Sequence, residues 1–265
     1  MASLRARNVP ELLRAVLTAD ASRPRITWYG PDGERVELSA RTLDNWVAKT
    51  ANLLVEEFDA GPGTTVGVLL PAHWRTLTWL LATWMTGACA VVPEGTGARW
   101  SGPLTDVVVA ADPAAAVAAG ADPRALVGVA LPALATGFGP GLPAGAVDGA
   151  AEVRLRADVF LPPVEPVPGD PAFRVASAEP VAHADLLPSA AAAARAAHLP
   201  PRARLLSAAG PERAVEELLA PLLVDGSVVL HVAGLAAGDV ARIADQEQVT
   251  RWAPGAGGGS VGPAG

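Results

Sequence analysis

Residues 34–93 read ERVELSARTLDNWVAKTANLLVEEFDAGPGTTVGVLLPAHWRTLTWLLATWMTGACAVVP, and this stretch decides the fold. Ser39 stands before a helical pattern, where its hydroxyl can accept a free N–H group of the first turn. Seven residues then recur at helical spacing and form one apolar stripe: Leu43, Trp46, Val47, Thr50, Leu53, Leu54 and Phe58. Gly61-Pro62-Gly63 turns the chain after them. The stretch therefore opens with a long amphipathic helix.

A strand–helix–strand unit follows this helix. Val66–Leu70 is an apolar run closed by Pro71, which is typical of a strand buried on both faces. Residues 73–86 return to helical spacing, and Gly87 ends them. Ala88–Val92 is a second apolar run. Because the joints are short, we expect a βαβ unit with parallel strands.

The order of these residues resembles the N-terminal region of adenylate-forming enzymes, the AMP-binding superfamily of acyl-CoA synthetases, adenylation domains and luciferases. The matching residues are Leu38-Ser39, Leu43, Ala51, Leu53, Gly61, Val66, Val68-Leu69-Leu70-Pro71, Leu81-Ala82, Gly87-Ala88 and Val92-Pro93. They are packing and turn positions, so the resemblance concerns fold and ancestry. It implies an α/β fold with a layered, mostly parallel sheet, helices on both faces and an N-terminal hairpin. Arg25–Tyr29 and Arg35–Leu38, which flank a Gly-Pro-Asp-Gly turn, would form that hairpin.

Composition excludes several classes of protein. The chain has 265 residues, 51% hydrophobic and 18% charged, which suits a well-packed domain and argues against global disorder. The net charge of −7 disfavours nucleic acid as the main partner. Cys89 is the one cysteine, so an internal disulfide is impossible, and we expect it to be a buried apolar residue of a strand. The longest apolar run, residues 79–92, is too short to span a bilayer. We therefore expect a cytoplasmic protein without membrane contact.

The rest of the chain continues the α/β alternation. Residues 1–22 resemble a surface helix, and 106–131 a second βαβ unit that continues one parallel sheet. The proline- and glycine-rich residues 132–171 form a long connection, with a short strand near 152–156. Further strands are expected at 171–177, 203–207, 227–232 and 249–252, and helices at 184–198, 211–222 and 239–246. We expect one domain over residues 1–253, or two sublobes divided near 132–171, and a disordered glycine-rich tail over 254–265.

Residues 170–199 have the outline of the family's phosphate-loop region, where a strand of the form D.A.I.YTSGTTG.PKG delivers a loop that holds ATP phosphates. Asp170, Ala172 and Ser177 match the strand and the loop entry, but the loop's glycines, paired threonines and lysine are missing. Glu179 places a negative charge where the triphosphate would lie, and Pro180 removes an N–H donor. The match resumes over residues 196–232. A remnant of nucleotide binding would therefore rest on Ser177, Ala178 and Glu179, and we expect no catalytic residue.

Other candidate sites have weaker support. His73, His183, His198 and His231 lack metal-ligand spacing, so we expect structural or surface roles and no metal. A triad of Ser177, His183 and Asp185 is a minor alternative, because sequence neighbours are poor evidence for it. Lys49, the only lysine, is expected to be a solvated or snorkelling residue of the first large helix. Trp46, Trp74 and Trp84 are expected in the core, whereas Trp100 and Trp252 would line a pocket or an interface.

Three hypotheses follow from the sequence. The first is a truncated, degenerate relative of adenylate-forming enzymes that has lost the phosphate loop and the C-terminal catalytic domain, needs no cofactor, and binds a protein partner or a small ligand. The second is an AMP-dependent acid ligase, or a half-enzyme completed by a partner chain, which would need ATP and Mg²⁺. The third is a small-molecule binding domain whose site lies at the carboxyl ends of its strands, with residues 132–171 as a lid. Apolar edges left open by an incomplete sheet would favour a homodimer.

Overall fold

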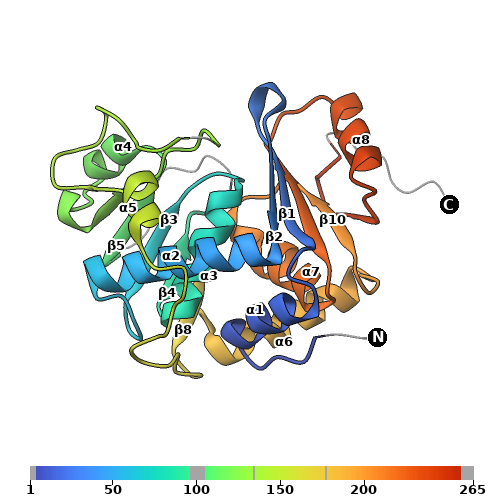
Figure 1. Cartoon of the computed structure of the whole chain (residues 1–265), viewed down its shortest axis with the longest axis horizontal. Coiled ribbons are helices and arrows are strands. Elements are labelled where there is room, and N and C mark those ends of the chain that lie inside the picture. Colours follow the sequence, from blue (N-terminus) through green and yellow to red (C-terminus); the bar gives the residue numbers. More distant parts are fainter. Residues whose placement is uncertain (1–3, 96–104, 134, 177, 258–265) are drawn as a thin grey trace.

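The computed structural model describes residues 4–95, 105–133, 135–176 and 178–257, which form two mostly parallel sheets with helices on their faces (Figure 1). The larger sheet has the strand order β7-β6-β5-β3-β4-β8-β9. Its strands are β3 (Thr65–Leu69), β4 (Cys89–Val92), β5 (Val107–Ala110), β6 (Leu126–Gly128), β7 (Val147–Asp148), β8 (Pro171–Val175) and β9 (Val181–Ala182). The smaller sheet has the order β12-β10-β11-β1-β2. Its strands are β1 (Pro24–Tyr29), β2 (Arg35–Ser39), β10 (Arg204–Ser207), β11 (Ser227–His231) and β12 (Arg251–Trp252). The expected α/β fold is confirmed.

The helices cover both sheets (Figure 1). They are α1 (Val9–Ala19), α2 (Ala40–Phe58), α3 (Trp74–Thr86), α4 (Pro113–Ala118), α5 (Gly149–Leu155), α6 (His183–Ala196), α7 (Ala220–Leu223) and α8 (Ala237–Gln246), with a π-helix at Val215–Leu219. None of these helices combines the length and the apolarity needed to cross a membrane.

The stretch that decides the fold adopts the expected structure. Ser39 caps α2, where its hydroxyl accepts the N–H of Thr42. Gly87 ends α3 in the left-handed conformation (φ 84°), which glycine adopts without steric cost. Strands β3 and β4 are parallel, and β1 and β2 form the expected antiparallel hairpin. Cys89 is buried in β4, and burial raises the pKa of its thiol.

Helix α3 lies between the two sheets and has no solvent face. Every residue of α3 except Met85 is buried, and the helix contacts β3 and β4 of the larger sheet and β1 of the smaller one. Its buried threonines donate their hydroxyl protons to backbone carbonyls, as Thr78 does to Trp74 and Thr83 does to Trp79. Hence α3 is buried on all sides without leaving these hydroxyls unsatisfied.

Two expectations about the strands are wrong. The unit β5–α4–β6 does continue the sheet of β3 and β4, but β10, β11 and β12 do not. Strand β11 pairs instead with β1, because Ile26 and Trp28 lie opposite Val228 and Leu230, and β10 joins β11 to β12. The short strand expected at residues 152–156 is part of helix α5, which Asp148 caps. Residues 254–257 form a turn with Ala256 buried, and residues 258–265 of the expected tail lie outside the described residues.

The connection after α5 is held against α2 rather than over a strand end. Lys49 donates to the carbonyl of Arg156, so its ammonium group is bound by the protein and is not free in solvent. Asn52 donates to the carbonyls of Ala157 and Val159. Arg156 itself forms ion pairs with carboxylates of α2 and α5: Glu56, Glu57 and Glu152. This binding makes the segment a surface crossing.

Asp225 joins the first and last parts of the smaller sheet. Its carboxylate contacts Arg23 at 2.7 Å, Arg25 at 2.9 Å and Arg202 at 3.3 Å. The side chain of Arg25 is fully buried and also donates to the carbonyls of Asp225, Gly226 and Val16. Burial alone would raise the pKa of Asp225, but the hydrogen bonds from Arg23 and Arg25 outweigh it and lower the pKa.

We expect Asp225→Asn to reduce the free energy of unfolding by about 3 kcal/mol, because it leaves the buried guanidinium of Arg25 without a counter-ion. Asparagine tolerates the left-handed backbone at this position (φ 59°). Since the folded pKa of Asp225 is depressed, its stabilisation is present above the unfolded value and is lost as the pH falls through the folded pKa. Urea unfolding between pH 2 and pH 7 measures both effects.

The matched control is Asp239→Asn, which breaks an exposed ion pair with Arg242 and should change the free energy of unfolding by less than about 0.5 kcal/mol. Equal losses in the two variants would contradict the role assigned to Asp225.

Candidate functional site

Residues 176 and 178–180 lie between β8 and β9, where the sequence has the outline of a phosphate-loop region. These two strands pair antiparallel, so the chain reverses directly after Val175. The N–H of Ala176 donates to the carbonyl of Val92 at 2.7 Å, and the N–H of Ala178 donates to that of Val175 at 2.9 Å. Both groups are therefore unavailable to a ligand, and Pro180 has no N–H group.

The predicted remnant residues do not form a site in the described part of the chain. Ser177 lies outside the described residues. Ala178 and Glu179 are exposed, and neither lines any of the cavities described below. A phosphate loop needs several converging N–H donors, whereas this turn offers few and carries the negative side chain of Glu179.

The histidines have structural surroundings. His183 is buried at the start of α6, where its Nε2 lies 3.0 Å from the carbonyl oxygen of Gly87, and burial lowers its pKa. The ring thus joins α6 to the end of α3, which argues against the triad with Asp185. His231 contacts the carbonyls of Val232 and Ala256. No group of His, Cys, Asp and Glu side chains suited to a metal occurs in the described ranges.

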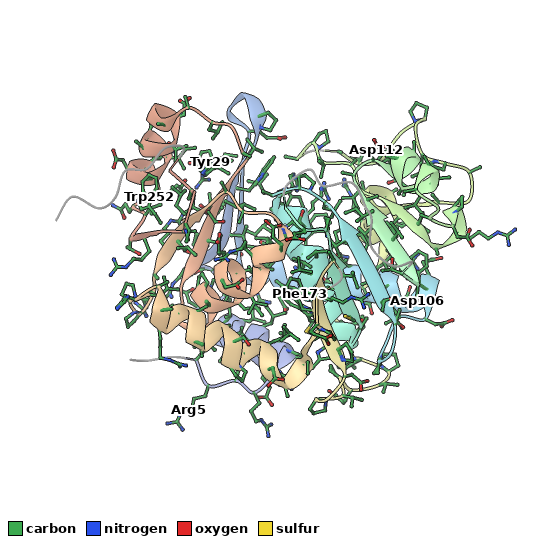
Figure 2. The ribbon with its side chains drawn as sticks, turned by 180° about the vertical axis from the view of Figure 1, so that it is seen from behind. Arg5, Tyr29, Asp106, Asp112, Phe173 and Trp252 are labelled. Carbon is green, nitrogen blue, oxygen red and sulfur yellow. The ribbon has the colours of Figure 1, made fainter. Side chains whose placement is uncertain are left out.

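A cavity of about 320 Å³ lies beyond β10 and β12, beneath the C-terminal half of α6. Its volume is at the lower end of the range for small-molecule sites. Its apolar walls are Ala193, Ala196, Ala197, Leu199, Leu205, Trp252, Ala253 and Pro254. Trp252 is 48% exposed at the edge of the smaller sheet, where Figure 2 labels it. The sequence therefore placed Trp252 correctly at a pocket, whereas Trp100 lies outside the described residues.

Four charged residues complete the cavity: Arg213, Glu216, Glu217 and Arg251. Glu217 is 7% exposed, and its carboxylate accepts hydrogen bonds from Ser207 and from Arg213. Burial raises the pKa of Glu217, although these two hydrogen bonds oppose the shift. One oxygen of Glu216, Oε2, is buried and has no donor among the described residues. The cavity thus joins an apolar wall to two carboxylates, and Oε2 of Glu216 is the oxygen that lacks a hydrogen-bond donor.

The local sequence explains how the acidic pair reaches this wall. Residues 215–219 form a π-helix, a wider turn that often occurs at functional sites. It places Glu217 beside the end of β10, against Ser207. Sequence reasoning missed both residues, and the available signal was a pair of glutamates inside the otherwise apolar run 214–224.

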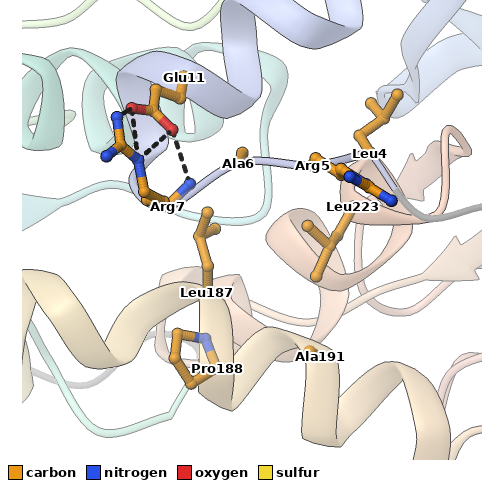
Figure 3. A pocket seen from close by; sticks show the side chains of 9 residues that line it. All are labelled: Leu4, Arg5, Ala6, Arg7, Glu11, Leu187, Pro188, Ala191 and Leu223. Carbon is orange, nitrogen blue, oxygen red and sulfur yellow. Dashed lines mark hydrogen bonds and ion pairs between the residues drawn. The ribbon is translucent and has the colours of Figure 1, made fainter.

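A larger hollow of about 850 Å³ lies between α1, α6 and α7, and Figure 3 shows its lining. It is open to solvent, and its floor is formed by Leu187, Pro188 and Leu223. Its carboxylate, Glu11, is already bound to Arg7 at 2.6 Å. No buried polar group points to a ligand among its described residues, so we do not regard this hollow as the site.

Comparison with known proteins supports the family resemblance. A TIGR03089 family protein of Mycobacterium tuberculosis (strain ATCC 25618 / H37Rv) is 38% identical over 247 residues, which cover 91% of this chain and 95% of that protein. The solved acyl-CoA synthetase of Brucella canis has a TM-score of 0.78 and 21% identity, covering 92% of this chain and 46% of its own. Anthranilate CoA ligase AuaEII in complex with anthranoyl-AMP has a TM-score of 0.70 and 19% identity, covering 92% and 49%. The chain therefore spans about half the length of these solved structures and shares their fold. No family model matches it.

We expect the stability of the Glu217→Gln variant relative to the natural protein to increase as the pH rises above about 4.5. Burial raises the folded-state pKa of Glu217 above its ordinary value of 4.5. Ionising Glu217 therefore destabilises the folded state as the pH rises from the unfolded-state pKa to the folded-state pKa, and glutamine cannot ionise. Thermal unfolding from pH 4 to pH 8 measures the difference in Tm, with Glu165→Gln, which removes an exposed carboxylate, as the baseline. A difference that stays constant with pH would show that Glu217 titrates equally in both states.

Proposed function

The chain belongs to the TIGR03089 family, and from this membership and its half-length acyl-CoA synthetase fold we propose that it is a non-catalytic relative of adenylate-forming enzymes that binds a small organic ligand. The observation that carries the proposal is the turn between β8 and β9, where the N–H groups of Ala176 and Ala178 are engaged and the sequence has Glu179 and Pro180. The scaffold of the superfamily remains, and the groups that would hold ATP are missing from it.

The electrostatics of the turn support the loss of nucleotide binding. A triphosphate needs positive charge and free N–H groups, and the family supplies them with glycines, hydroxyls and a lysine. Lys49 is bound to Arg156 far along α2, and Glu179 would repel the phosphates. The protein's role therefore rests on binding, without ATP or Mg²⁺ as cofactors.

The cavity beside Glu217 supports a small ligand in place of a reaction. Its walls suit an apolar body, and the buried oxygen of Glu216 suits a hydrogen-bond donor at one end of that body. No nucleophile paired with a general base lies among its described lining residues. Ser207, which does not line the cavity, is hydrogen-bonded to Glu217. A small molecule with an apolar body and an amine or amide end fits this arrangement. No residue of the 132–171 connection lines the cavity, so that segment is not its lid.

A second candidate is a half-enzyme completed by another polypeptide or by a second copy of the chain. The observation in its favour is the edge strand β12, in which Arg251 and Trp252 are exposed and pair with β10 alone in the described sheet. An open strand edge is a natural place for another chain to add. Light scattering distinguishes monomer from homodimer, and affinity capture followed by an adenylation assay of the captured complex tests for a completing partner.

We expect the purified protein to give no binding heat with millimolar ATP and Mg²⁺, and no ATP–pyrophosphate exchange with a panel of carboxylic acids. The physical reason is that the N–H groups of Ala176 and Ala178 are already bonded, Pro180 has no N–H group, and Glu179 carries a negative charge. A working acyl-CoA synthetase serves as the positive control, and circular dichroism confirms that the protein is folded. Exchange above background in the purified protein would refute the proposal.

The cavity is tested by filling it. We expect benzylamine, an apolar ring with a donor end, to bind the natural protein and to bind Ala193→Leu at least about tenfold more weakly, because the larger side chain occupies the cavity. Ala192→Leu is the matched control, since Ala192 is exposed and does not line the cavity. Ligand-observed NMR measures the affinities. Equal weakening in both variants would place the binding elsewhere.

A further inference from the structure

Arg75 is a buried arginine without a counter-ion. It lies in the first turn of α3 and is 7% exposed, yet no carboxylate of the described residues forms an ion pair with it. Its Nε is buried and has no acceptor, whereas Nη1 and Nη2 are not sealed. A buried charge is normally paired, because the loss of hydration is otherwise uncompensated. This position therefore needs an anion that the described chain does not supply.

Two tryptophans pack beside the guanidinium. The Cζ atom of Arg75 lies 4.4 Å from the ring centroid of Trp74 and 5.7 Å from that of Trp46. The two indoles meet edge to face at 5.4 Å, so they lie on the same side of the guanidinium. The planar N–H edge that carries Nη1 and Nη2 can still donate to a ligand, and this edge matches a planar oxyanion.

The surrounding charges favour a monovalent anion. Glu34 attracts Arg75, but its Oε1 accepts the N–H of Ala133 at 2.7 Å and it makes no ion pair with Arg75. Arg154 adds a second positive charge to the same region. Burial, together with the positive charge of Arg154, lowers the pKa of Arg75 to about 10 against the attraction of Glu34. Arg75 therefore stays charged at neutral pH, and the three groups together carry a single net positive charge.

The neighbouring groups add donors without adding charge. His73 Nδ1 accepts the N–H of Arg75 at 3.0 Å, and burial lowers the pKa of His73 to about 3, so its ring is neutral. The indole Nε1 of Trp74 is buried and has no acceptor in the described chain. The N-terminus of α3 contributes further partial positive charge. These groups lie at the carboxyl end of β3, where α3 begins (Figure 1). Trp28 of the smaller sheet is beside them, and its ring lies 4.1 Å from that of His73.

We propose that Arg75, framed by Trp46 and Trp74 at the start of α3, binds the carboxylate of a small organic acid. The guanidinium edge donates two parallel hydrogen bonds to the two carboxylate oxygens. The site is separate from the cavity beside Glu217 and does not depend on the proposed function.

The test compares sodium propionate with sodium chloride at equal ionic strength. We expect propionate to raise the Tm of the natural protein more than chloride does, because a ligand that binds only the folded state stabilises it. In Arg75→Met this difference should vanish. In Arg75→Lys, which keeps the charge but not the planar fork, the apparent affinity should fall by at least about tenfold. Quenching of tryptophan fluorescence gives the affinities independently.

Arg242→Met is the matched control, since Arg242 is exposed on α8 and pairs with Asp239; it should respond to propionate as the natural protein does. Equal effects of propionate and chloride on the natural protein would overturn the proposal, and so would an unchanged response in Arg75→Lys. A stronger effect of inorganic phosphate than of propionate would overturn the carboxylate as the ligand. If Arg75→Met does not fold, the comparison of Arg75→Lys with the natural protein decides.

Discussion

The burial of α3 between two sheets is the constraint on which the rest of the structure depends. Two indole N–H groups fix the helix, one to each sheet. Trp84 donates to the carbonyl of Ala172 in β8 at 2.9 Å, and Trp28 of β1 donates to the carbonyl of Ala72, just before α3, at 3.2 Å. Because α3 is buried on all sides, separating either sheet from it would expose hydrophobic area to water. The two sheets share one hydrophobic core.

The same constraint explains where polar groups collect. Helix α3 begins at the carboxyl end of β3, and the N–H groups of its first turn have no acceptor within the helix. His73 meets part of this need by accepting the N–H of Arg75. The indoles of Trp28 and Trp74 surround that turn, so it is shielded from water yet rich in donors. Unpaired buried donors gather at this first turn, whereas the N–H groups of Ala176 and Ala178 between β8 and β9 are already engaged.

Sequence patterns predicted the local structure well and the long-range pairing poorly. The unit β3–α3–β4 was predictable because Pro71, Gly87 and the apolar runs are local signals. The membership of β10–β12 in a second sheet was not, since any apolar run fits either sheet equally and pairing partners leave no local mark. The acceptor of Lys49 could not be predicted for a related reason: it is the carbonyl of Arg156, which lies more than a hundred residues away. At the candidate site, Trp252 was predicted because an exposed aromatic near a strand end is unusual. Glu217 was missed because its π-helical turn is not visible in the periodicity.

The pairing of β1 with β11 sets the order in which the chain can fold as it is made. Ile26 lies beside Val228, about two hundred residues later in the chain. At a bacterial synthesis rate of roughly 5–20 residues per second, the N-terminal hairpin waits on the order of ten to forty seconds for this neighbour. The strands of the larger sheet, by contrast, all lie between residues 65 and 182 and emerge from the ribosome in one block. Strand β1 thus stays without its β11 neighbour through most of synthesis, so the smaller sheet can close only after all strands of the larger sheet have been made.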